Sequence, residues 1–266
     1  MKDVVVIRGA GDLATGIGHR LHRSGFKIVM LDIEKPLVIR RTVSFAQAIF
    51  EGEIEIDGVT GIRVETIEEV KKAWEDGNIP VMVDPECKII ESIKADILVD
   101  AIMAKRNIGT KKDMAPITIA IGPGFEANKD VDVVIETNRG HYLGSLIFEG
   151  KAQENTGIPG LIMGYGKERV IKSPESGVIK NIKKIGDVVK KGEDIAYVEN
   201  VPVKATLDGT LRGIIKNGSK VLKDLKIADI DPRCSRDHCF TISDKARSIG
   251  GGVLEAILYM KNKKGM

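Results

Sequence analysis

A glycine-rich turn near the beginning of the chain has the residue types and spacing of a phosphate-binding turn. The apolar run 4–7 leads into Gly9-Ala-Gly11-Asp-Leu-Ala14, a helical pattern follows, and a second apolar run ends at Asp32. In this pattern the glycines let the backbone turn tightly and approach a phosphate, and the acidic residue can bind a ribose. The N-terminus of the helix adds unpaired N–H groups and a partial positive charge. We therefore expect a nucleotide or phosphate-bearing cofactor to bind at six residues: Gly9, Gly11, Asp12, Ala14, Thr15 and Asp32.

Asp12 is unusual in such a turn. It could cap the helix, but its negative charge lies directly after the second glycine, close to where a pyrophosphate would bind. This favours other phosphate ligands over an ordinary dinucleotide. A turn that is kept for structural reasons alone is the alternative.

Polar residues of the first half are predicted to gather along one edge of a sheet. Apolar runs alternate here with helical patterns, which indicates an α/β sheet with crossover connections. Ligands of such sheets bind beyond the carboxyl ends of the strands. The loops after Asp100 and Glu136 carry Arg106, Arg139 and His141, which suit anion recognition and acid–base chemistry. We expect these three side chains to face a ligand; solvated arginines and helix-capping acids are the structural alternative.

The second half contains an internal repeat. Gly177 is followed nine residues later by Gly186, and Gly209 is followed nine residues later by Gly218, so the two units are 32 residues apart. Each unit predicts two strands joined by a glycine turn. The pattern resembles the biotinyl/lipoyl barrel-sandwich hybrid, but the neighbours of Lys204 predict a strand rather than a hairpin tip. We therefore expect no covalent lipoate or biotin, and interpret the segment as a docking or structural domain.

The segment Cys234-Ser-Arg-Asp-His238-Cys239 combines thiols with an imidazole. Its spacing matches no four-ligand zinc pattern, so we expect no metal site, with zinc binding as a weaker alternative. A histidine can lower the pKa of a nearby thiol, which makes Cys239 the candidate nucleophile and a small buried cysteine the alternative. Further on, residues 249–260 predict an amphipathic helix that Gly250-Gly-Gly252 disfavours. Either this helix begins after the glycines or another segment approaches them closely.

Together these patterns predict an α/β protein with a Rossmann-like doubly wound sheet, followed by a small all-β barrel-sandwich hybrid and a C-terminal helix. The expected nucleotide- or cofactor-binding domain spans 1–149 and a Gly-rich connector spans 150–167. The barrel-sandwich (lipoyl-like) domain spans 168–232, and the C-terminal segment 233–266 has a helix that returns to the first domain.

Charge and composition argue against several classes of function. Lys and Arg number 41 against 38 Asp and Glu, and aromatic residues make up 4% of the chain. This balance disfavours nucleic-acid binding. No apolar run has the length of a transmembrane helix, and residues 1–8 predict a strand rather than a signal peptide. Three cysteines are typical of a reducing compartment. We expect a cytoplasmic protein that binds neither nucleic acid nor membrane; a homo-oligomer is compatible with the sequence.

Four segments together resemble one protein family. They are Val6-Ile-Arg-Gly-Ala-Gly-Asp-Leu-Ala-Thr-Gly16, Glu136-Thr-Asn-Arg-Gly-His141, Ile230-Asp-Pro-Arg233 and Ile242-Ser-Asp-Lys-Ala-Arg-Ser-Ile-Gly-Gly-Gly-Val-Leu-Glu-Ala256. They are similar to the accessory proteins of selenium-dependent molybdenum hydroxylase systems. The resemblance implies a cytoplasmic bacterial or archaeal protein that helps to mature or insert the molybdenum cofactor of xanthine-dehydrogenase-like hydroxylases. The hydroxylase and its maturation machinery would be its partners.

The resemblance implies a pathway but no particular reaction, so whether the protein is an enzyme stays open. Molybdopterin-type cofactors carry phosphate and often a nucleotide, which suits the predicted turn, and sulfur or selenium transfer would use a thiolate such as Cys239. Two alternatives are an NAD(P)-dependent oxidoreductase, since Asp32 and the turn also fit NAD, and a non-catalytic docking module built on the repeat.

Overall fold

The computed structural model describes residues 3–155, 157 and 159–266, and the chain folds as two compact units. The first unit comprises Met1–Pro36, Ser44–Thr156 and Ile242–Met266, and the second comprises Leu37–Val43 and Gly157–Thr241. The beginning of the strand predicted at 1–8 and positions 156 and 158 of the predicted connector lie outside the described residues.

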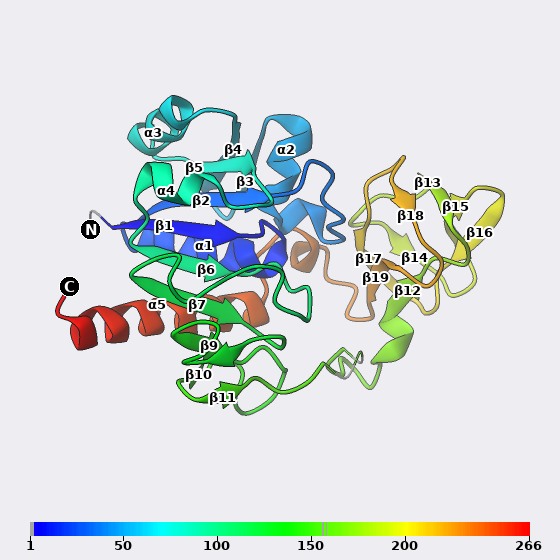
Figure 1. The fold of residues 1–266 in the computed structure, drawn as a ribbon. Helices are drawn as coiled ribbons and strands as arrows, with labels where there is room; N and C mark the ends of the chain where they lie inside the picture. The colour runs from blue at the N-terminus through cyan, green and yellow to red at the C-terminus, as the bar shows by residue number, and fades with distance from the viewer. Residues whose placement is uncertain (1–2, 156, 158) are drawn as a thin grey trace. The chain divides into compact units, whose positions relative to one another are not determined.

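A nine-stranded mixed sheet forms the centre of the first unit, in the order β10-β9-β7-β6-β1-β2-β5-β4-β3 (Figure 1). The strands are β1 (Val4–Arg8), β2 (Lys27–Asp32), β3 (Glu53–Ile56), β4 (Val59–Val64), β5 (Ile79–Val83), β6 (Ile97–Asp100), β7 (Ile117–Ile121), β9 (Val133–Ile135) and β10 (Leu146–Ile147). The seven inner strands run parallel, whereas β3 and β10 pair antiparallel at the two edges. Strands β6 and β7 are buried along their whole length and are apolar except for Asp100 and Thr118, as is typical of central parallel strands.

The helices of the first unit pack against this sheet. They are α1 (Asp12–Arg23), the 3₁₀ turn η2 (Phe45–Gln47), α2 (Ala48–Glu51), α3 (Ile67–Glu75), α4 (Ile89–Ile93) and α5 (Asp244–Lys264), and a small sheet pairs β8 (Glu126–Ala127) with β11 (Gly150–Lys151). Helix α3 begins with a capping box between Thr66 and Glu69. In the described part of the chain, no helix combines the length and the apolar character that a membrane crossing needs.

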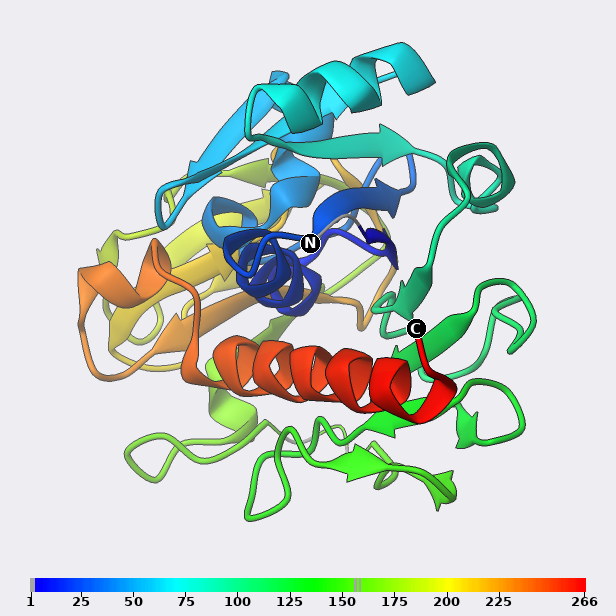
Figure 2. The same ribbon diagram turned by 90° about the vertical axis from the view of Figure 1, so that its left-hand side faces the viewer.

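Helix α5 runs through the three consecutive glycines and lies beside α1 (Figure 2). It begins after Ser243, whose hydroxyl accepts the N–H of Ala246 at 3.2 Å. A Cβ atom at Gly250 would lie only 2.7 Å from the carbonyl oxygen of Gly16 in α1. Of the two interpretations that the sequence left open, the close approach of another segment is therefore correct. Gly250 of α5 and Gly16 of α1 let the two helices approach closely at this point.

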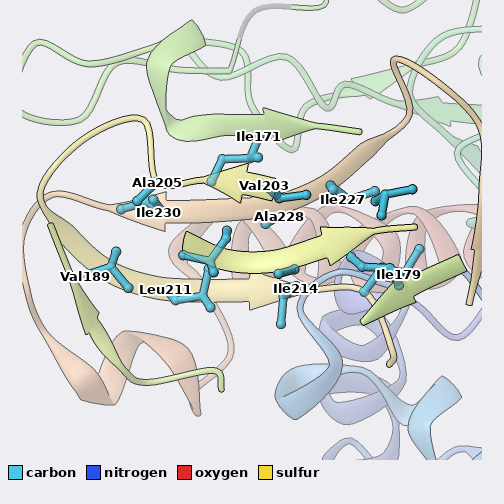
Figure 3. Packing of buried hydrophobic residues seen from close by; sticks show 14 of the residues in the cluster. Ile171, Ile179, Val189, Val203, Ala205, Leu211, Ile214, Ile227, Ala228 and Ile230 are labelled. Carbon is cyan, nitrogen blue, oxygen red and sulfur yellow. The ribbon is translucent and has the colours of Figure 1, made fainter. Parts of the chain in front are cut away.

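Two four-stranded antiparallel sheets form the second unit, in the orders β12-β19-β17-β14 and β16-β15-β13-β18. Their strands are β12 (Val170–Lys172), β13 (Gly177–Asn181), β14 (Val188–Val189), β15 (Asp194–Val198), β16 (Val201–Lys204), β17 (Gly209–Ile214), β18 (Lys220–Val221) and β19 (Lys226–Asp231); η1 (Arg41–Val43), η3 (Lys167–Arg169) and η4 (Arg236–Cys239) are 3₁₀ turns. Because β14 pairs with β17 and β13 with β18, each sheet contains strands from both glycine repeats. Buried residues such as Ile179, Ile214 and Ile230 form a single apolar core (Figure 3).

Lys204 lies at the end of β16, away from the hairpin tip. Its Nζ atom is 2.6 Å from Oδ1 of Asp194 and 3.4 Å from the carbonyl oxygen of Gly192. The tip of the β15–β16 hairpin is formed by Glu199 and Asn200. The lysine is thus held along the strand by an ion pair, a position unlike that of a displayed carrier lysine.

The expected fold, a Rossmann-like doubly wound sheet followed by a barrel-sandwich hybrid, is wrong, although the C-terminal helix is present as α5. The large sheet is mixed, because the hairpin predicted within 54–64 joins it as β3 and β4 and because β10 folds back onto β9. The described links from β6 to β7 and from β7 to β9 contain no helix, so regular strand–helix alternation ends after β6. The repeat forms two antiparallel sheets, and the described residues show no combination of a Rossmann sheet with a lipoyl-type barrel. The chain is a mixed α/β protein.

Candidate functional site

The turn between β1 and α1 presents an open helix end at the carboxyl edge of the large sheet. Gly9 has a φ of +101°, and a Cβ atom there would lie 2.8 Å from the carbonyl oxygen of Ala101, just after β6. Gly11 is the N-cap of α1, and the first helical hydrogen bond runs from the N–H of Thr15 to the carbonyl of Gly11 at 2.8 Å. The N–H groups before Thr15 precede this first hydrogen bond, as at the start of any α-helix, and Gly11 and Leu13 are partly exposed. The helix end has the polarity that an anion requires.

Asp32 and Thr15 shape this turn from within. The Asp32 carboxylate accepts the N–H of Ala10 at 2.9 Å through Oδ2 and the N–H of Ile33 at 2.8 Å through Oδ1. Burial raises the pKa of Asp32, and these two hydrogen bonds oppose the rise. The hydroxyl of Thr15 is buried and accepts the N–H of Phe45 at 2.8 Å. Both side chains are therefore engaged in holding the turn in place.

Asp12 and Ala14, which were also predicted to bind the ligand, lie in the first helical turn of α1. Gly11 occupies the capping position and Asp12 is the first helical residue, so the prediction that Asp12 caps the helix is wrong. A carboxylate in the first turn still interacts favourably with the helix dipole. Ala14 is 1% exposed, and its small side chain permits close packing of the helix on the sheet.

A buried ion pair that sequence reasoning missed lies at the carboxyl ends of β1 and β6. Arg8 and Asp100 are 4% and 2% exposed, and Nη1 of Arg8 is 3.6 Å from Oδ2 of Asp100. Thr110 links them, because its hydroxyl donates to Oδ2 of Asp100 at 2.6 Å and accepts from Nη1 of Arg8 at 2.5 Å. Burial raises the pKa of Asp100, whereas the hydrogen bonds from Thr110 and Ile102 and the charge of Arg8 lower it. The sequence contained one signal for this ion pair, because Arg8 and Asp100 each end an apolar run.

Cys87 lies near this ion pair, after β5. It is 1% exposed, and burial raises the pKa of its thiol to about 11, an effect that Arg8 opposes and that Asp84 and Asp100 reinforce. The thiol is therefore protonated at neutral pH, which disfavours a nucleophilic role for Cys87.

The loops after β6, β7 and β9 meet at the same edge of the sheet. A Cβ atom at Gly124 would lie 2.6 Å from the backbone nitrogen of Arg106, and one at Gly122 would lie 2.6 Å from Oγ1 of Thr137. The side chain of Arg106 is exposed, whereas Glu136 and Thr137 are buried. The structure thus brings together the loops that carry Arg106, Arg139 and His141.

Arg139 forms a bidentate ion pair with Asp244, the first residue of α5. Its Nη1 and Nη2 atoms are each 2.8 Å from one carboxylate oxygen of Asp244. The two side chains are 40% and 73% exposed, so the pair stabilises the fold by at most about 1 kcal/mol. His141 is exposed, with its ring 5.0 Å from that of Tyr142. A ligand at this rim would have to compete with Asp244 for Arg139.

The thiol expected to be reactive lies buried in the second unit. Cys239 is 0% exposed, and burial raises the pKa of its thiol. Cys234, on the loop between β19 and η4, is exposed. Nucleophilic reactivity requires an accessible thiolate, so the arrangement favours Cys234 over Cys239. Within the described residues, no group of three or more His, Cys, Asp and Glu side chains is arranged to hold a metal ion.

Native thiol labelling is expected to modify Cys234 and to leave Cys87 and Cys239 unmodified. A neutral alkylating reagent followed by peptide mass spectrometry measures this, with labelling of all three cysteines in denaturant as the reference. Cys234→Ser should abolish fast native labelling, whereas the matched variant Cys239→Ser should not change it. Fast labelling of Cys239 in the folded protein would contradict its burial.

The sequence of the chain has a curated relative of about twice its length. The chain is 52% identical over 260 residues to the "Uncharacterized protein YqeB" of Escherichia coli (strain K12). The match covers 98% of this chain and 48% of the relative, so the chain spans about half the length of that protein. No family model matches the chain.

Solved structures show weak likenesses. An aspartoacylase family protein from Mesorhizobium loti has a TM-score of 0.27 at 11% identity, over 86% of this chain and 84% of that one. A succinylglutamate desuccinylase from Silicibacter sp. TM1040 has a TM-score of 0.26 at 12% identity, with 86% and 84% covered. The ectoine utilization protein EutE (DoeB) from Ruegeria pomeroyi has a TM-score of 0.27 at 11% identity, with 86% and 85% covered. Likenesses at this level carry no argument about this chain.

Proposed function

We propose that the protein is an accessory protein for the maturation of a selenium-dependent molybdenum hydroxylase. In this role it binds a nucleotide or a phosphate-bearing, molybdopterin-type cofactor at the turn between β1 and α1. The partners are the hydroxylase and its maturation machinery, and the protein acts in the cytoplasm.

The convergence of the resembling segments around α1 and α5 is the observation that carries this proposal. Gly16, in the first segment, faces Ala246 and Gly250, in the last one. Arg139, in the second segment, pairs with Asp244 of the last segment. Three stretches that are far apart in the sequence thus share contacts within one unit, beside the carboxyl ends of the parallel strands. This position suits a ligand site.

The residues of the turn fit a phosphate group. The N–H groups at the start of α1 precede the first helical hydrogen bond, and the helix dipole favours an anion there. The exposed side chain of Arg106 lies on a neighbouring loop and offers a guanidinium fork of the kind that binds phosphate. A molybdopterin-type cofactor would supply its own molybdenum chemistry, and these residues would bind and orient its phosphate.

Gly11→Leu tests the proposal at a position whose backbone conformation suits a side chain. The φ of Gly11 is −68°, which any residue can adopt, whereas a side chain at Gly9 would be strained and would collide with Ala101. We expect Gly11→Leu to reduce the activity of the partner hydroxylase by about tenfold or more in cells, at unchanged hydroxylase level, because the leucine covers the N–H groups.

Gly11→Ala, which adds only a methyl group, is the graded comparison and should have a smaller effect. Gly251→Ala on α5, where a Cβ atom would meet nothing within 4 Å, is the matched control and should leave maturation unchanged. Normal hydroxylase activity with Gly11→Leu, at wild-type stability of the variant, would contradict the proposal.

A further inference from the structure

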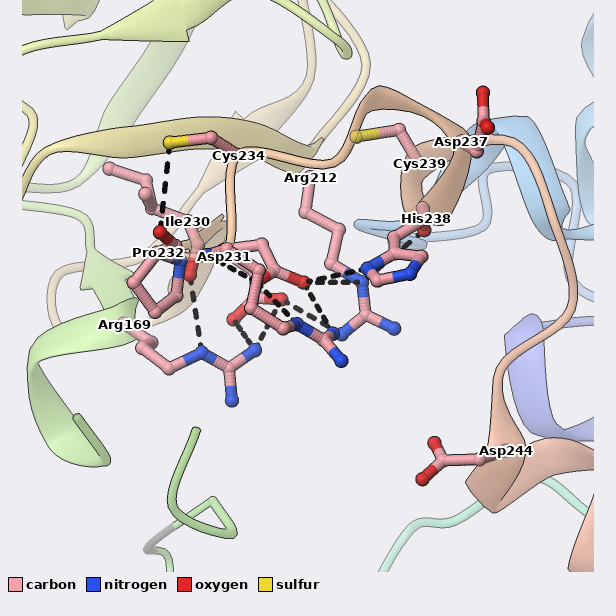
Figure 4. A network of polar contacts seen from close by, with 12 residues as sticks. Arg169, Arg212, Ile230, Asp231, Pro232, Cys234, Asp237, His238, Cys239 and Asp244 are labelled. Atoms are coloured by element: carbon pink, nitrogen blue, oxygen red, sulfur yellow. Dashed lines mark hydrogen bonds and ion pairs between the residues drawn. The ribbon is translucent and has the colours of Figure 1, made fainter. Parts of the chain in front are cut away.

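A cluster of arginine and aspartate side chains lies at the end of β19 in the second unit (Figure 4). Asp229 and Asp231 are 5% and 0% exposed and, two residues apart on one strand, lie on the same face of the sheet. Nη2 of Arg169 is 3.4 Å from Oδ2 of Asp229, and Nη2 of Arg233 is 2.6 Å from Oδ2 of Asp231. Arg212 is more distant from both carboxylates, because its Nη1 is 3.7 Å from Oδ2 of Asp229 and its Nε is 3.8 Å from Oδ2 of Asp231.

Asp231 is ionised and is bound closely by Arg233. The guanidinium of Arg233 donates to both oxygens of Asp231, at 2.9 and 2.6 Å, and its backbone N–H donates at 3.1 Å. Burial alone would raise the pKa of Asp231, but the hydrogen bonds of Arg233 and the charges of Arg233 and Arg212 hold it at about 2. The two carboxylates therefore have close arginine partners in Arg233 and Arg169.

Among the described residues, the guanidinium group of Arg212 uses only part of its hydrogen-bonding capacity. Its side chain is 13% exposed, and its one hydrogen bond runs from Nε to the carbonyl oxygen of His238 at 3.4 Å. Its distances to Asp229 and Asp231 exceed hydrogen-bond length, so among the described residues Nη1 and Nη2 donate to no acceptor. Neither Nη atom is among the fully buried polar atoms that lack a partner in the described part of the chain, so both are accessible to solvent and to a ligand.

The side chains around Arg212 add positive charge and a further polar group. Nδ1 of His238 is 3.8 Å from Oδ2 of Asp231 and, although the atom is buried, has no hydrogen-bond partner among the described residues. Burial lowers the pKa of Arg169. The charge of Asp229 raises this pKa, whereas repulsion from Arg212 lowers it further. In Figure 4, Arg169 and Arg212 extend to one side of the loop that follows β19, whereas the side chain of Cys234 points to the other side.

We propose that Arg212, together with His238, binds a phosphate group, either as free inorganic phosphate or as part of a phosphomonoester. Arg169, whose guanidinium already donates to Ile230, Gly160 and Asp229, contributes only its positive charge. The planar fork of Arg212 matches two phosphate oxygens, and a partly shielded site strengthens such charge-assisted hydrogen bonds. This site lies within the second unit and is independent of the turn between β1 and α1. The thiol of Cys234, on the opposite side of the loop, takes no part in it.

Calorimetric titration with inorganic phosphate and with ribose 5-phosphate tests this site, with Gly11→Leu as the background protein. That background removes binding at the first turn, so the result does not depend on the function proposed above. We expect saturable binding of one phosphate per chain, weakened about tenfold or more by Arg212→Gln and less by Arg212→Lys, which keeps the charge but loses the fork. Tighter binding of ribose 5-phosphate would identify a phosphomonoester as the ligand, and equal or weaker binding would identify free phosphate.

Two further variants complete the test. Lys204→Gln, on an exposed strand end of the same unit, is the matched control and should leave phosphate binding unchanged. His238→Gln alters a side chain that is 40% exposed, so its expected weakening of binding can be measured even if Arg212→Gln fails to fold. Absence of saturable phosphate binding in the Gly11→Leu background, or equal binding by that protein and its Arg212→Gln and His238→Gln variants, would overturn the proposal.

Discussion

Arg8→Met is expected to lower the free energy of unfolding by about 3–5 kcal/mol in urea denaturation at neutral pH. The substitution removes the guanidinium 3.6 Å from Asp100, a carboxylate that is 2% exposed. Only the hydroxyl of Thr110 and the N–H of Ile102 would then donate to this buried charge. Methionine replaces the stem of arginine with a flexible apolar chain, so the expected loss comes mainly from the unpaired charge rather than from a cavity.

The loss of stability in Arg8→Met should be larger at neutral pH than at acidic pH. Burial already raises the pKa of Asp100 in the folded protein, and the charge of Arg8 limits the rise. Without Arg8 the folded-state pKa increases further. A raised carboxyl pKa contributes stability that is fully present below the unfolded pKa, about 3.9, and is lost as the pH rises through the folded pKa. The deficit of Arg8→Met relative to the wild type should therefore be largest at neutral pH and shrink toward pH 4.

Two comparisons separate the buried charge from other effects. Arg63→Met breaks an ion pair with Glu65 whose side chains are 42% and 70% exposed, and should cost about 1 kcal/mol or less. The double variant Arg8→Met/Asp100→Asn removes the stranded charge and should recover part of the loss. Equal losses for Arg8→Met and Arg63→Met, or a pH-independent deficit, would contradict this account of the ion pair.

Gly252→Ala is expected to lower the free energy of unfolding by about 2–3 kcal/mol, against the usual helix preference for alanine. A Cβ atom at Gly252 would overlap the carbonyl oxygen of Gly144 and lie 3.2 Å from Cγ2 of Ile135 in β9. Backbone of the loop after β9 would have to move away from α5. Thermal or urea unfolding measures the change.

Gly251→Ala is the control and should change the free energy of unfolding in the opposite direction. It lies in the same helix, one position earlier, and its Cβ atom would meet nothing within 4 Å. Because alanine is about 1 kcal/mol better than glycine in a helix, this variant should be more stable than the wild type. Destabilisation of both variants to the same extent would show that close packing at Gly252 does not decide the effect.

Local patterns in the sequence predicted most of the elements. The run 4–7 became β1, the helical pattern after Gly11 became α1, and the hairpin expected within 54–64 became β3 and β4. These elements depend on residue spacing and turn chemistry, which neighbouring residues determine. The glycine repeat also predicted strands, and the pairing of β14 with β17 shows that its two units interlock.

Contacts between distant residues could not be predicted in the same way. Arg8 and Thr110 are 102 positions apart, and Arg139 and Asp244 are 105 positions apart. Each pair depends on the strand order and on the path of α5, which no local pattern defines. For this reason Arg139 was expected to face a ligand, whereas the structure pairs it with a carboxylate of its own chain.

The roles of the two C-terminal cysteines were also beyond local reasoning. The proximity of His238 suggested an activated thiol at Cys239, but burial within the second unit raises the pKa of that thiol. Cys234 is exposed because it lies on the loop before η4, a position that the sequence spacing alone did not distinguish. The fold class was wrong for a related reason, since the antiparallel edges formed by β3 and β10 depend on which strands pair.

We propose that the open helix end at Gly11 binds a phosphate-bearing cofactor. Mass spectrometry of the small molecules that co-purify from native cells with the wild type and with Gly11→Leu tests it most directly. The proposal predicts that a nucleotide other than NAD(P), or a phosphorylated pterin, is retained by the wild type in a defined ratio to the protein and is lost from Gly11→Leu. Retention of NAD(P), equal retention by both proteins, or no phosphorylated molecule on the wild type would contradict it.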